Sequence, residues 1–452
     1  MCVLFKPEMA TDTAQKPTMN APSLAEVNAS VRLGGPAIGW RRLLGFLGPG
    51  FLISVGYMDP GNWATDIAGG SRYGYTLLSV IMLSNLMAVL LQSLSLKLGV
   101  ATERDLAQMC REATGKWVGA GLWLGAEVAI AACDLAEVIG SAIALNLLFH
   151  IPLMWGVLIT GLDVLLILVL QNWGFRKLEA VVITLIGTIV ALFGIQMVLS
   201  RPEYGTAMWS MFVPSAQIVK NPDLLYIAIG ILGATVMPHN LYLHSALVQS
   251  RNYERTPKGK REAIKLANID SAAALTVALF VNASILIVAA AVFHRSGHYE
   301  VAGIEDAYKL LSPLLGAGFA STLFAVALLA SGQSSSITGT LAGQVVMEGF
   351  VRLKVAPWVR RLMTRSIAIA PTVVVVALWG EHGTEKLLLL SQVILSLQLS
   401  FAVVPLVIFT GSRKRMGDFV NAPWVKGLAW AVAVVIAGLN GWFVVLLFAP
   451  GR

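Results

Sequence analysis

Charged side chains are scarce in this sequence. Asp, Glu, Lys and Arg make up 13% of its 452 residues, and 56% of the residues are hydrophobic, whereas an average soluble domain is about a quarter charged. A soluble protein of this length could not bury so much apolar surface. Repeated apolar runs of about 20 residues, separated by short polar loops, instead predict an all-α polytopic membrane protein.

Other features are missing as well. The three cysteines, Cys2, Cys110 and Cys133, are scattered, so neither a disulfide framework nor a thiolate metal cluster is indicated. The sequence has no HExxH motif, no GxSxG motif and no Ser/His pair at a plausible membrane depth, so we predict that it is not an enzyme and has no resident cofactor. Residues 1–40 lack the apolar core of a signal peptide, and we interpret them as a disordered cytoplasmic tail.

The apolar runs predict eleven transmembrane helices in a plasma (bacterial inner) membrane. With the N-terminus in the cytoplasm and the C-terminus outside, 26 of the 33 Lys and Arg residues fall in cytoplasmic segments, as the positive-inside rule requires. We therefore attribute the net charge of +8 to basic residues that set the orientation of the protein in the membrane, and it does not indicate a nucleic acid partner. The predicted spans are 43–70, 74–97, 117–149, 152–171, 178–200, 223–249, 267–293, 315–348, 364–380, 386–410 and 424–448.

The first span contains the stretch GYMDPGN at residues 56–62. A proline inside a helix removes a hydrogen bond and clashes with the preceding turn, and a neighbouring glycine weakens the helix further. We therefore expect this span to unwind near its middle. The freed carbonyl groups must then be buried in protein or line a wet cavity, and Asp59 needs a partner at that depth.

The sixth span repeats this pattern, with Met237, Pro238, His239 and Asn240 in the middle of GATVMPHNLYLHS. One such break could be a simple kink. Two breaks, in the first and sixth spans, favour a transporter of five plus five inverted helices with its substrate site at the midplane, and an eleventh helix outside the repeat. The expected units are a tail at 1–40, repeats at 41–200 and 201–410, and a final helix at 411–452.

The atoms at the two breaks predict a cation site. Asp59 supplies a carboxylate, Asn62 an amide oxygen and Met237 a thioether sulfur, and the freed carbonyls around Gly56 and Ala234 add neutral oxygens. Mg²⁺ and Ca²⁺ sites use oxygen alone, whereas a mixture of carboxylate and sulfur suits Mn²⁺ or Fe²⁺. The alternative is that Met237 is an ordinary packing residue.

At these residues the sequence resembles the Nramp family of proton-coupled divalent metal transporters, in particular its bacterial manganese-transporting branch. DPGN at 59–62 and MPHN at 237–240 match the two signature breaks, and GQSSSITGTLAGQVVMEGF at 332–350 and SQVILSLQLSFAVVPL at 391–406 resemble the eighth and tenth spans. Ser400 stands where a proline is expected. The resemblance implies the LeuT-type fold, and metal ligation by Asp59, Asn62, Met237 and the carbonyls near Gly56 and Ala234, with a state-dependent role for Gln392.

Glu127, Asp134 and Glu137 in the third span lie within an arc of about 80° on one helix face. Acids along one stripe of a membrane helix need water, protons or cations. They could instead form salt bridges with the arginines that begin the ninth span, namely Arg360, Arg361 and Arg365. The family resemblance implies that these acids and arginines form a proton route separate from the path of the metal.

Two histidines follow the second break. His239 and His244 could relay a proton or bind metal, because histidine titrates near neutral pH. Each could also be a polar group satisfied within the protein.

The leading hypothesis is a proton-driven importer of Mn²⁺, with Fe²⁺ and Cd²⁺ as further substrates, acting as a monomer in the lipid bilayer. The runner-up is an amino-acid/cation symporter on the same LeuT-type fold. An anionic Asp59 would repel the carboxylate of an amino acid, which argues against that alternative. A passive channel is disfavoured because paired broken helices are typical of alternating access.

Overall fold

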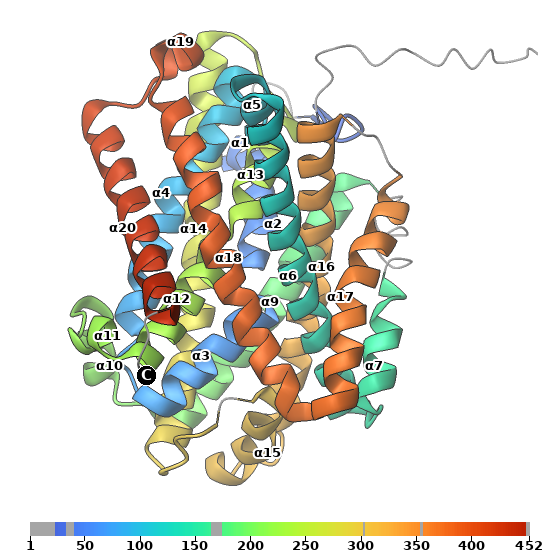
Figure 1. Ribbon diagram of the computed structural model, residues 1–452, viewed down its shortest axis with the longest axis vertical. Coiled ribbons are helices and arrows are strands. Elements are labelled where there is room, and N and C mark those ends of the chain that lie inside the picture. The colour runs from blue at the N-terminus through green and yellow to red at the C-terminus, as the bar shows by residue number, and fades with distance from the viewer. Residues whose placement is uncertain (1–22, 33–39, 164–173, 302, 353–355, 449–452) are drawn as a thin grey trace, which may run out of the picture.

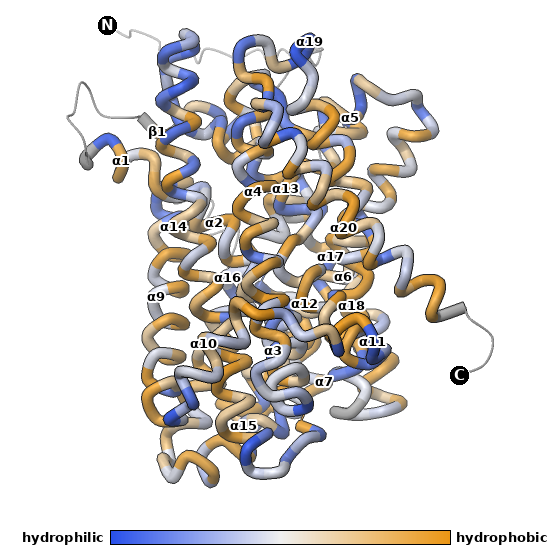
Figure 2. The backbone as a smooth tube through the Cα atoms, turned by 90° about the vertical axis from the view of Figure 1, so that its left-hand side faces the viewer, coloured by the Kyte–Doolittle hydropathy of each residue, from blue (hydrophilic) through white to orange (hydrophobic). Residues whose placement is uncertain are grey.

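The computed structural model describes residues 23–32, 40–163, 174–301, 303–352 and 356–448. Long helices run along one axis and form a single bundle (Figure 1). Hydrophilic residues gather towards the two ends of the bundle, with a largely hydrophobic band between them (Figure 2). We call these the α5 end, which also carries α19, and the α15 end, which also carries α10 and α11.

Within these described residues, eight helical stretches are long and apolar enough to cross a membrane. Six of them are single helices: α4 (Leu78–Thr102), α6 (Lys116–Phe149), α9 (Phe175–Ser200), α17 (Pro357–Trp379), α18 (Glu381–Thr410) and α20 (Pro423–Phe448). The other two are α14 (Pro257–Ala289), which is continued by the π-helix η2 (Ala290–His294), and the interrupted pair α12 (Pro222–Thr235) and α13 (Pro238–Leu247). The all-α membrane fold is therefore confirmed.

Three predicted spans do not meet that length or hydropathy criterion, so the number eleven stays a prediction. The first is divided into α1 (Trp40–Phe46), α2 (Pro49–Gly56) and α3 (Pro60–Tyr73). The fourth begins as α7 (Leu153–Thr160), and its remainder, from residue 164, lies outside the described residues. The eighth is the 32-residue helix α16 (Ala320–Val351), which begins five residues later than predicted.

Both predicted breaks are present. In the first, α2 ends at Gly56 and α3 begins at Pro60, with Asp59 as its N-cap. In the second, α12 ends at Thr235 and α13 begins at Pro238, with Met237 as its N-cap. The first residue of a helix has no helical partner for its N–H, so proline, which lacks this N–H, is well suited to that position. Pro60 and Pro238 therefore interrupt the preceding half-helix and also begin the next one.

Short helices occupy segments that the hydropathy pattern treats as loops. Helix α5 has a capping box, in which Asp105 and Gln108 satisfy each other's backbone N–H groups, and α15 has Glu305 and Asp306 in its first turn. Such signals were readable in the sequence. The short helices are α5 (Leu106–Ala113), α10 (Tyr204–Phe212), α11 (Gln217–Lys220), α15 (Ile304–Leu315), α19 (Arg413–Met416), and the 3₁₀ turns η1 (Val248–Ser250) and η3 (Gly417–Phe419).

Residues 23–32 are folded against the α5 end of the bundle, which corrects the expectation of disorder for this part of the tail. The strand β1 (Val31–Arg32) pairs in parallel with β2 (Arg251–Asn252). Leu24 is buried, and its N–H donates to Glu348 Oε2 at 3.0 Å. Residues 1–22 and 33–39 of the expected tail lie outside the described residues.

This contact predicts a stability effect for two nested truncations. Removing residues 2–32 should lower the melting temperature of the detergent-solubilised protein by several degrees, because burying a leucine such as Leu24 alone is worth about 2 kcal/mol. Removing only residues 2–22 is the control and should leave the melting temperature nearly unchanged. Equal shifts for the two truncations would mean that the contacts of residues 23–32 contribute nothing measurable.

Candidate metal site

The first break places a carboxylate inside the bundle. Asp59 Oδ1 accepts a hydrogen bond from the backbone N–H of Asn62 at 2.8 Å, so the carboxylate caps the positive end of α3. The carbonyls of the two unwound residues beside it are satisfied by distant side chains. Asn282 Nδ2 donates to Tyr57 O at 2.7 Å, and Ser331 Oγ donates to Met58 O at 2.6 Å. The unwound backbone is thus paired within the protein, as its depth requires.

The proline spacing explains which carbonyls remain available. In a helix, the carbonyl of residue i accepts from the N–H of residue i+4, and proline has no N–H. Pro60 lies four residues after Gly56, and Pro238 lies four residues after Ala234. These two carbonyls are the ones predicted as ligands, and they lie at the negative ends of α2 and α12, where a cation is favoured.

The two breaks meet around Cys133 of α6. Cys133 Sγ lies 3.9 Å from Asp59 Oδ2, and Cys133 packs in one buried cluster with Met237. Gln392 of α18 contacts both breaks, because its side chain lies directly over Gly61 and its carbonyl oxygen directly over Gly233. The structure therefore brings the carboxylate, the thioether and Gln392 together, although each lies more than 150 residues from the next in the sequence.

Several buried oxygens at this place have no hydrogen-bond partner among the described residues. They include Asn62 Oδ1 and Gln392 Oε1, whose side chains are buried. An unsatisfied buried polar atom costs about 1–3 kcal/mol, and a cation would remove that cost. Within the described ranges, no group of three or more His, Cys, Asp or Glu side chains is arranged so that it could hold a metal ion, so the donor set here is one carboxylate with amide, carbonyl and thioether groups. The ligand set itself stays a prediction.

Part of the acidic stripe on α6 forms a buried ionic network. Glu137 accepts from Arg365 Nη1 at 3.4 Å and from Ser336 Oγ at 3.0 Å. Arg365 also forms an ion pair with Asp163. Glu137, Arg365 and Asp163 are all buried, and such a network is costly unless its members pair with one another.

The other members of the predicted proton route lie around this network. Glu127 pairs with Arg360 at 2.9 Å, and Arg365 Nη1 donates to the carbonyl of Asp134 at 3.2 Å. The alternative of salt bridges to α17 is therefore correct, and it does not exclude proton transfer. Arg361 belongs to α17, and its side chain lies outside the described part of the structure.

Cys133 and Ser336 were not identified from the sequence. Cys133 lies between the two functional groups, because its Sγ is 3.9 Å from Asp59 Oδ2 and 3.7 Å from Glu137 Oε1. Its position four residues before Glu137 on α6 was a readable signal, since residues at this spacing share a helix face. Ser336 contacts Glu137 from α16, and no sequence pattern reveals that long-range contact.

The two histidines have different surroundings. His244 Nδ1 lies 2.9 Å from Gln92 Oε1, and Gln92 Nε2 donates to the Tyr57 hydroxyl at 2.7 Å. This network connects α13, α4 and the first break. His239 Nδ1 is buried and has no partner within the described ranges.

Comparisons with known proteins agree with this architecture. The family model of natural resistance-associated macrophage protein-like (Nramp) proteins matches residues 50–446. A divalent metal cation transporter MntH of Listeria innocua is 61% identical over 430 residues, covering 95% of this chain and 96% of that one. The Nostoc sp. protein of the same name is 60% identical over 426 residues, covering 94% and 96%.

Solved structures of transporters have the same fold as this chain. The crystal structure of the Eremococcus coleocola manganese transporter has a TM-score of 0.87 at 43% identity, covering 95% of this chain and 93% of that one. Mhp1, a nucleobase-cation-symport-1 family transporter, has a TM-score of 0.60 at 15% identity, covering 92% and 91%. At that identity the likeness concerns the fold alone. The match over most of the chain confirms the resemblance read from the two breaks: this chain belongs to the Nramp family.

Proposed function

We propose that the chain transports divalent transition metal ions across a membrane, with Mn²⁺ as the main substrate and Fe²⁺ and Cd²⁺ as further ones. One observation carries the proposal: where the two helices are broken, the buried carboxylate of Asp59 lies 3.9 Å from Cys133 Sγ, and Met237 belongs to the same buried cluster as Cys133. Relatives that are about 60% identical are named divalent metal cation transporters. That family identity also agrees with the prediction that the chain is not an enzyme.

Metal movement is coupled to protons in this proposal. A contact chain supports it, running from Asp59 through Cys133 and Glu137 to Arg365 and Asp163. Ionisable groups inside a membrane protein that pair with one another are typical of proton relays. The route leaves the metal site along α6 towards α17 and α7, away from the axis of the two broken helices.

The proposed orientation has the α5 end in the cytoplasm and the α15 end outside. The basic loop that begins α14, the α5 segment and α19 all lie at one end of the bundle (Figure 1), and an excess of Lys and Arg marks the cytoplasmic side. Ions then enter from the α15 end and leave at the α5 end. The chain acts as a monomer in this scheme, because one chain carries both breaks and the whole buried network.

The runner-up is a symporter of amino acids or other organic solutes on the same fold. The distant likeness to Mhp1 supports only the fold. A buried Asp59 would repel a substrate carboxylate, and the space over Gly61 is filled by the Gln392 side chain. Both features favour a small cation over an organic solute.

Uptake by proteoliposomes tests the proposed function. The purified protein should accumulate Mn²⁺ when the outside is acidic, and collapsing the pH gradient should slow uptake. Fe²⁺ and Cd²⁺ should compete, whereas amino acids should neither compete nor accumulate. Accumulation of an amino acid without any effect of Mn²⁺ would replace this proposal with the runner-up.

Replacing Met237 should change selectivity more than capacity. Met237→Ala leaves the carboxylate, amide and carbonyl oxygens, so hard Ca²⁺ and Mg²⁺ lose no ligand, whereas Mn²⁺ and especially Cd²⁺ lose a sulfur contact. We expect uptake of Ca²⁺ relative to Mn²⁺ to rise on the order of tenfold, which corresponds to about 1.4 kcal/mol. The measurement is competitive uptake at matched expression.

The matched control is Met211→Ala, a partly buried methionine in α10 that is remote from both breaks. It should leave the ion preference unchanged. If Met237→Ala excludes Ca²⁺ and Mg²⁺ as well as the unmodified protein does, selectivity comes from cavity size or dehydration, and the interpretation of the thioether is wrong.

A further inference from the structure

A second carboxylate lies on the same face of α3 as the candidate metal ligands. Asp59, Asn62 and Asp66 are spaced by three and four residues, and side chains at these spacings line one face of a helix. Seven residues of helix correspond to about 10 Å along its axis. Asp66 therefore lies two turns beyond Asp59, on the half-helix that leads towards the α15 end.

The environment of Asp66 is unusual for an acid in a membrane protein. The residue is 1% exposed, and its Oδ2 has no hydrogen-bond partner among the described residues. No ion pair with Asp66 occurs in the described part of the chain. Asp66 also lies two turns from Asp59 along α3, so this buried stretch carries two acids. A buried carboxylate in this position requires a cation or a proton.

Helix α3 connects Asp66 to the α15 end of the bundle. Near the end of this helix, the Ser71 hydroxyl donates to the carbonyl of Val301, and His294 Nδ1 lies 2.9 Å from the carbonyl of Ser71. Val301 also lines an open pocket of about 640 Å³ at the surface. Helix α3 thus links this pocket to the first break, and Asp66 lies between them.

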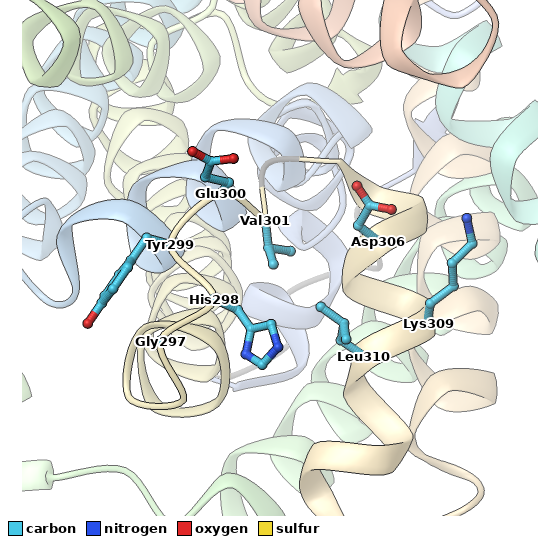
Figure 3. A pocket seen from close by; sticks show the side chains of 8 residues that line it. All are labelled: Gly297, His298, Tyr299, Glu300, Val301, Asp306, Lys309 and Leu310. Carbon is cyan, nitrogen blue, oxygen red and sulfur yellow. The ribbon is translucent and has the colours of Figure 1, made fainter.

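The surface pocket itself is not a metal cage. Glu300 and Asp306 lie on different sides of it, and Lys309 is beside Asp306 (Figure 3). Helix α3 runs from the first break towards this pocket. Among its described residues, the next buried acid after Asp59 in that direction is Asp66.

We propose that Asp66 is a second cation station, which holds a divalent metal ion transiently before the ion reaches Asp59. The inference rests on the proposed function, because it takes the α15 end as the side of entry. A single carboxylate, without a cage of further acids, suits transient holding of a divalent ion and not tight ligation. Two carboxylates two turns apart also raise the local cation concentration and speed association.

The geometry also explains how the ion would move on. An ion at Asp66 is drawn to Asp59, where an amide, two carbonyls and a thioether can replace its water. The station therefore acts on the rate of capture and leaves equilibrium binding at Asp59 nearly unchanged.

Asp66→Asn tests the proposal, because it removes the charge and keeps the shape. We expect the KM for Mn²⁺ uptake in proteoliposomes to rise about tenfold, in the range of electrostatic effects on association. The kcat should stay within a factor of two, and the Mn²⁺ affinity of the purified protein, measured by calorimetry, should stay within a factor of three. Asp66→Glu retains the charge and should restore most of the low KM.

The matched control is Asp223→Asn, which removes an exposed acid from the first turn of α12 at the same end of the bundle. It should leave KM unchanged and so exclude a general loss of surface charge. Melting temperatures of all variants show whether each is folded.

Three results would overturn the proposal. An unchanged KM for folded Asp66→Asn means that the residue does not capture ions. Loss of proton flux at unchanged KM makes Asp66 a proton site. A loss of equilibrium Mn²⁺ affinity that matches the rise in KM makes it a ligand or a structural support. If the unmodified protein itself fails to take up Mn²⁺, the proposed function fails instead.

Discussion

Mn²⁺ uptake should fall on the order of a hundredfold when Asp59 is replaced by asparagine. Asp59 is the one ionisable group in the predicted ligand set, and interactions with a buried charged group contribute about 1.5–3 kcal/mol each. A loss of about 3 kcal/mol corresponds to a hundredfold change in binding. The measurement is uptake of radioactive Mn²⁺ by proteoliposomes, together with Mn²⁺ affinity by calorimetry.

The matched control for this substitution is Glu300→Gln, which neutralises an exposed acid at the α15 end. It should transport Mn²⁺ normally. Near-normal uptake by correctly folded Asp59→Asn protein would show that the ion does not bind at the first break, and the proposed ligand set would have to be abandoned.

Proton flux that accompanies Mn²⁺ uptake should fall about tenfold in Glu137→Gln, while Mn²⁺ affinity changes little. Glu137 lies one contact beyond the metal site, through Cys133, and its partners are Arg365 and Ser336. The glutamine amide keeps the shape of the side chain but cannot exchange a proton, so the substitution removes one member of the relay. In enzymes, a positioned acid or base raises the reaction rate about 10²–10⁴-fold. A pH-sensitive dye inside the vesicles reports proton flux.

Glu203→Gln serves as the control, because Glu203 is an exposed acid preceding α10. Its proton flux should equal that of the unmodified protein. If Glu137→Gln loses Mn²⁺ binding and keeps the ratio of protons to metal, Glu137 supports the metal site and does not conduct protons.

The breaks could be predicted from sequence because their cause is local. Pro60 and Pro238 each remove an N–H from the helical ladder, and the carbonyls at Gly56 and Ala234 lose their partners whatever the tertiary structure is. The donor types follow from the same few residues. The candidate ligands could therefore be identified before the helices were placed in space.

Contacts that depend on tertiary structure could not be predicted in this way. Asp163 lies in the segment after α7 and had no assigned role, yet it pairs with Arg365. Residues 23–32 belong to a tail that is polar and proline-containing as a whole, but Leu24 and β1 find partners on α16 and beside η1. Nothing near these residues in the sequence reveals those partners.

A break also hides a span from a rule that requires one long apolar helix. The two halves of the first span, α2 and α3, have 8 and 14 residues, which is shorter than an ordinary transmembrane helix, and α3 is nearly all buried with polar residues along one face. A pattern rule that assumes lipid around each helix fails where a helix is surrounded by protein. The departure from the rule marks the functional segment.

X-ray absorption spectroscopy of the purified protein loaded with one equivalent of Mn²⁺, repeated with Cd²⁺, tests the ligand set most directly. The spectrum should require one sulfur neighbour and several oxygen neighbours, and the sulfur neighbour should disappear in Met237→Ala while the oxygens remain. A spectrum of oxygen neighbours alone in the unmodified protein would contradict a metal site built from both breaks.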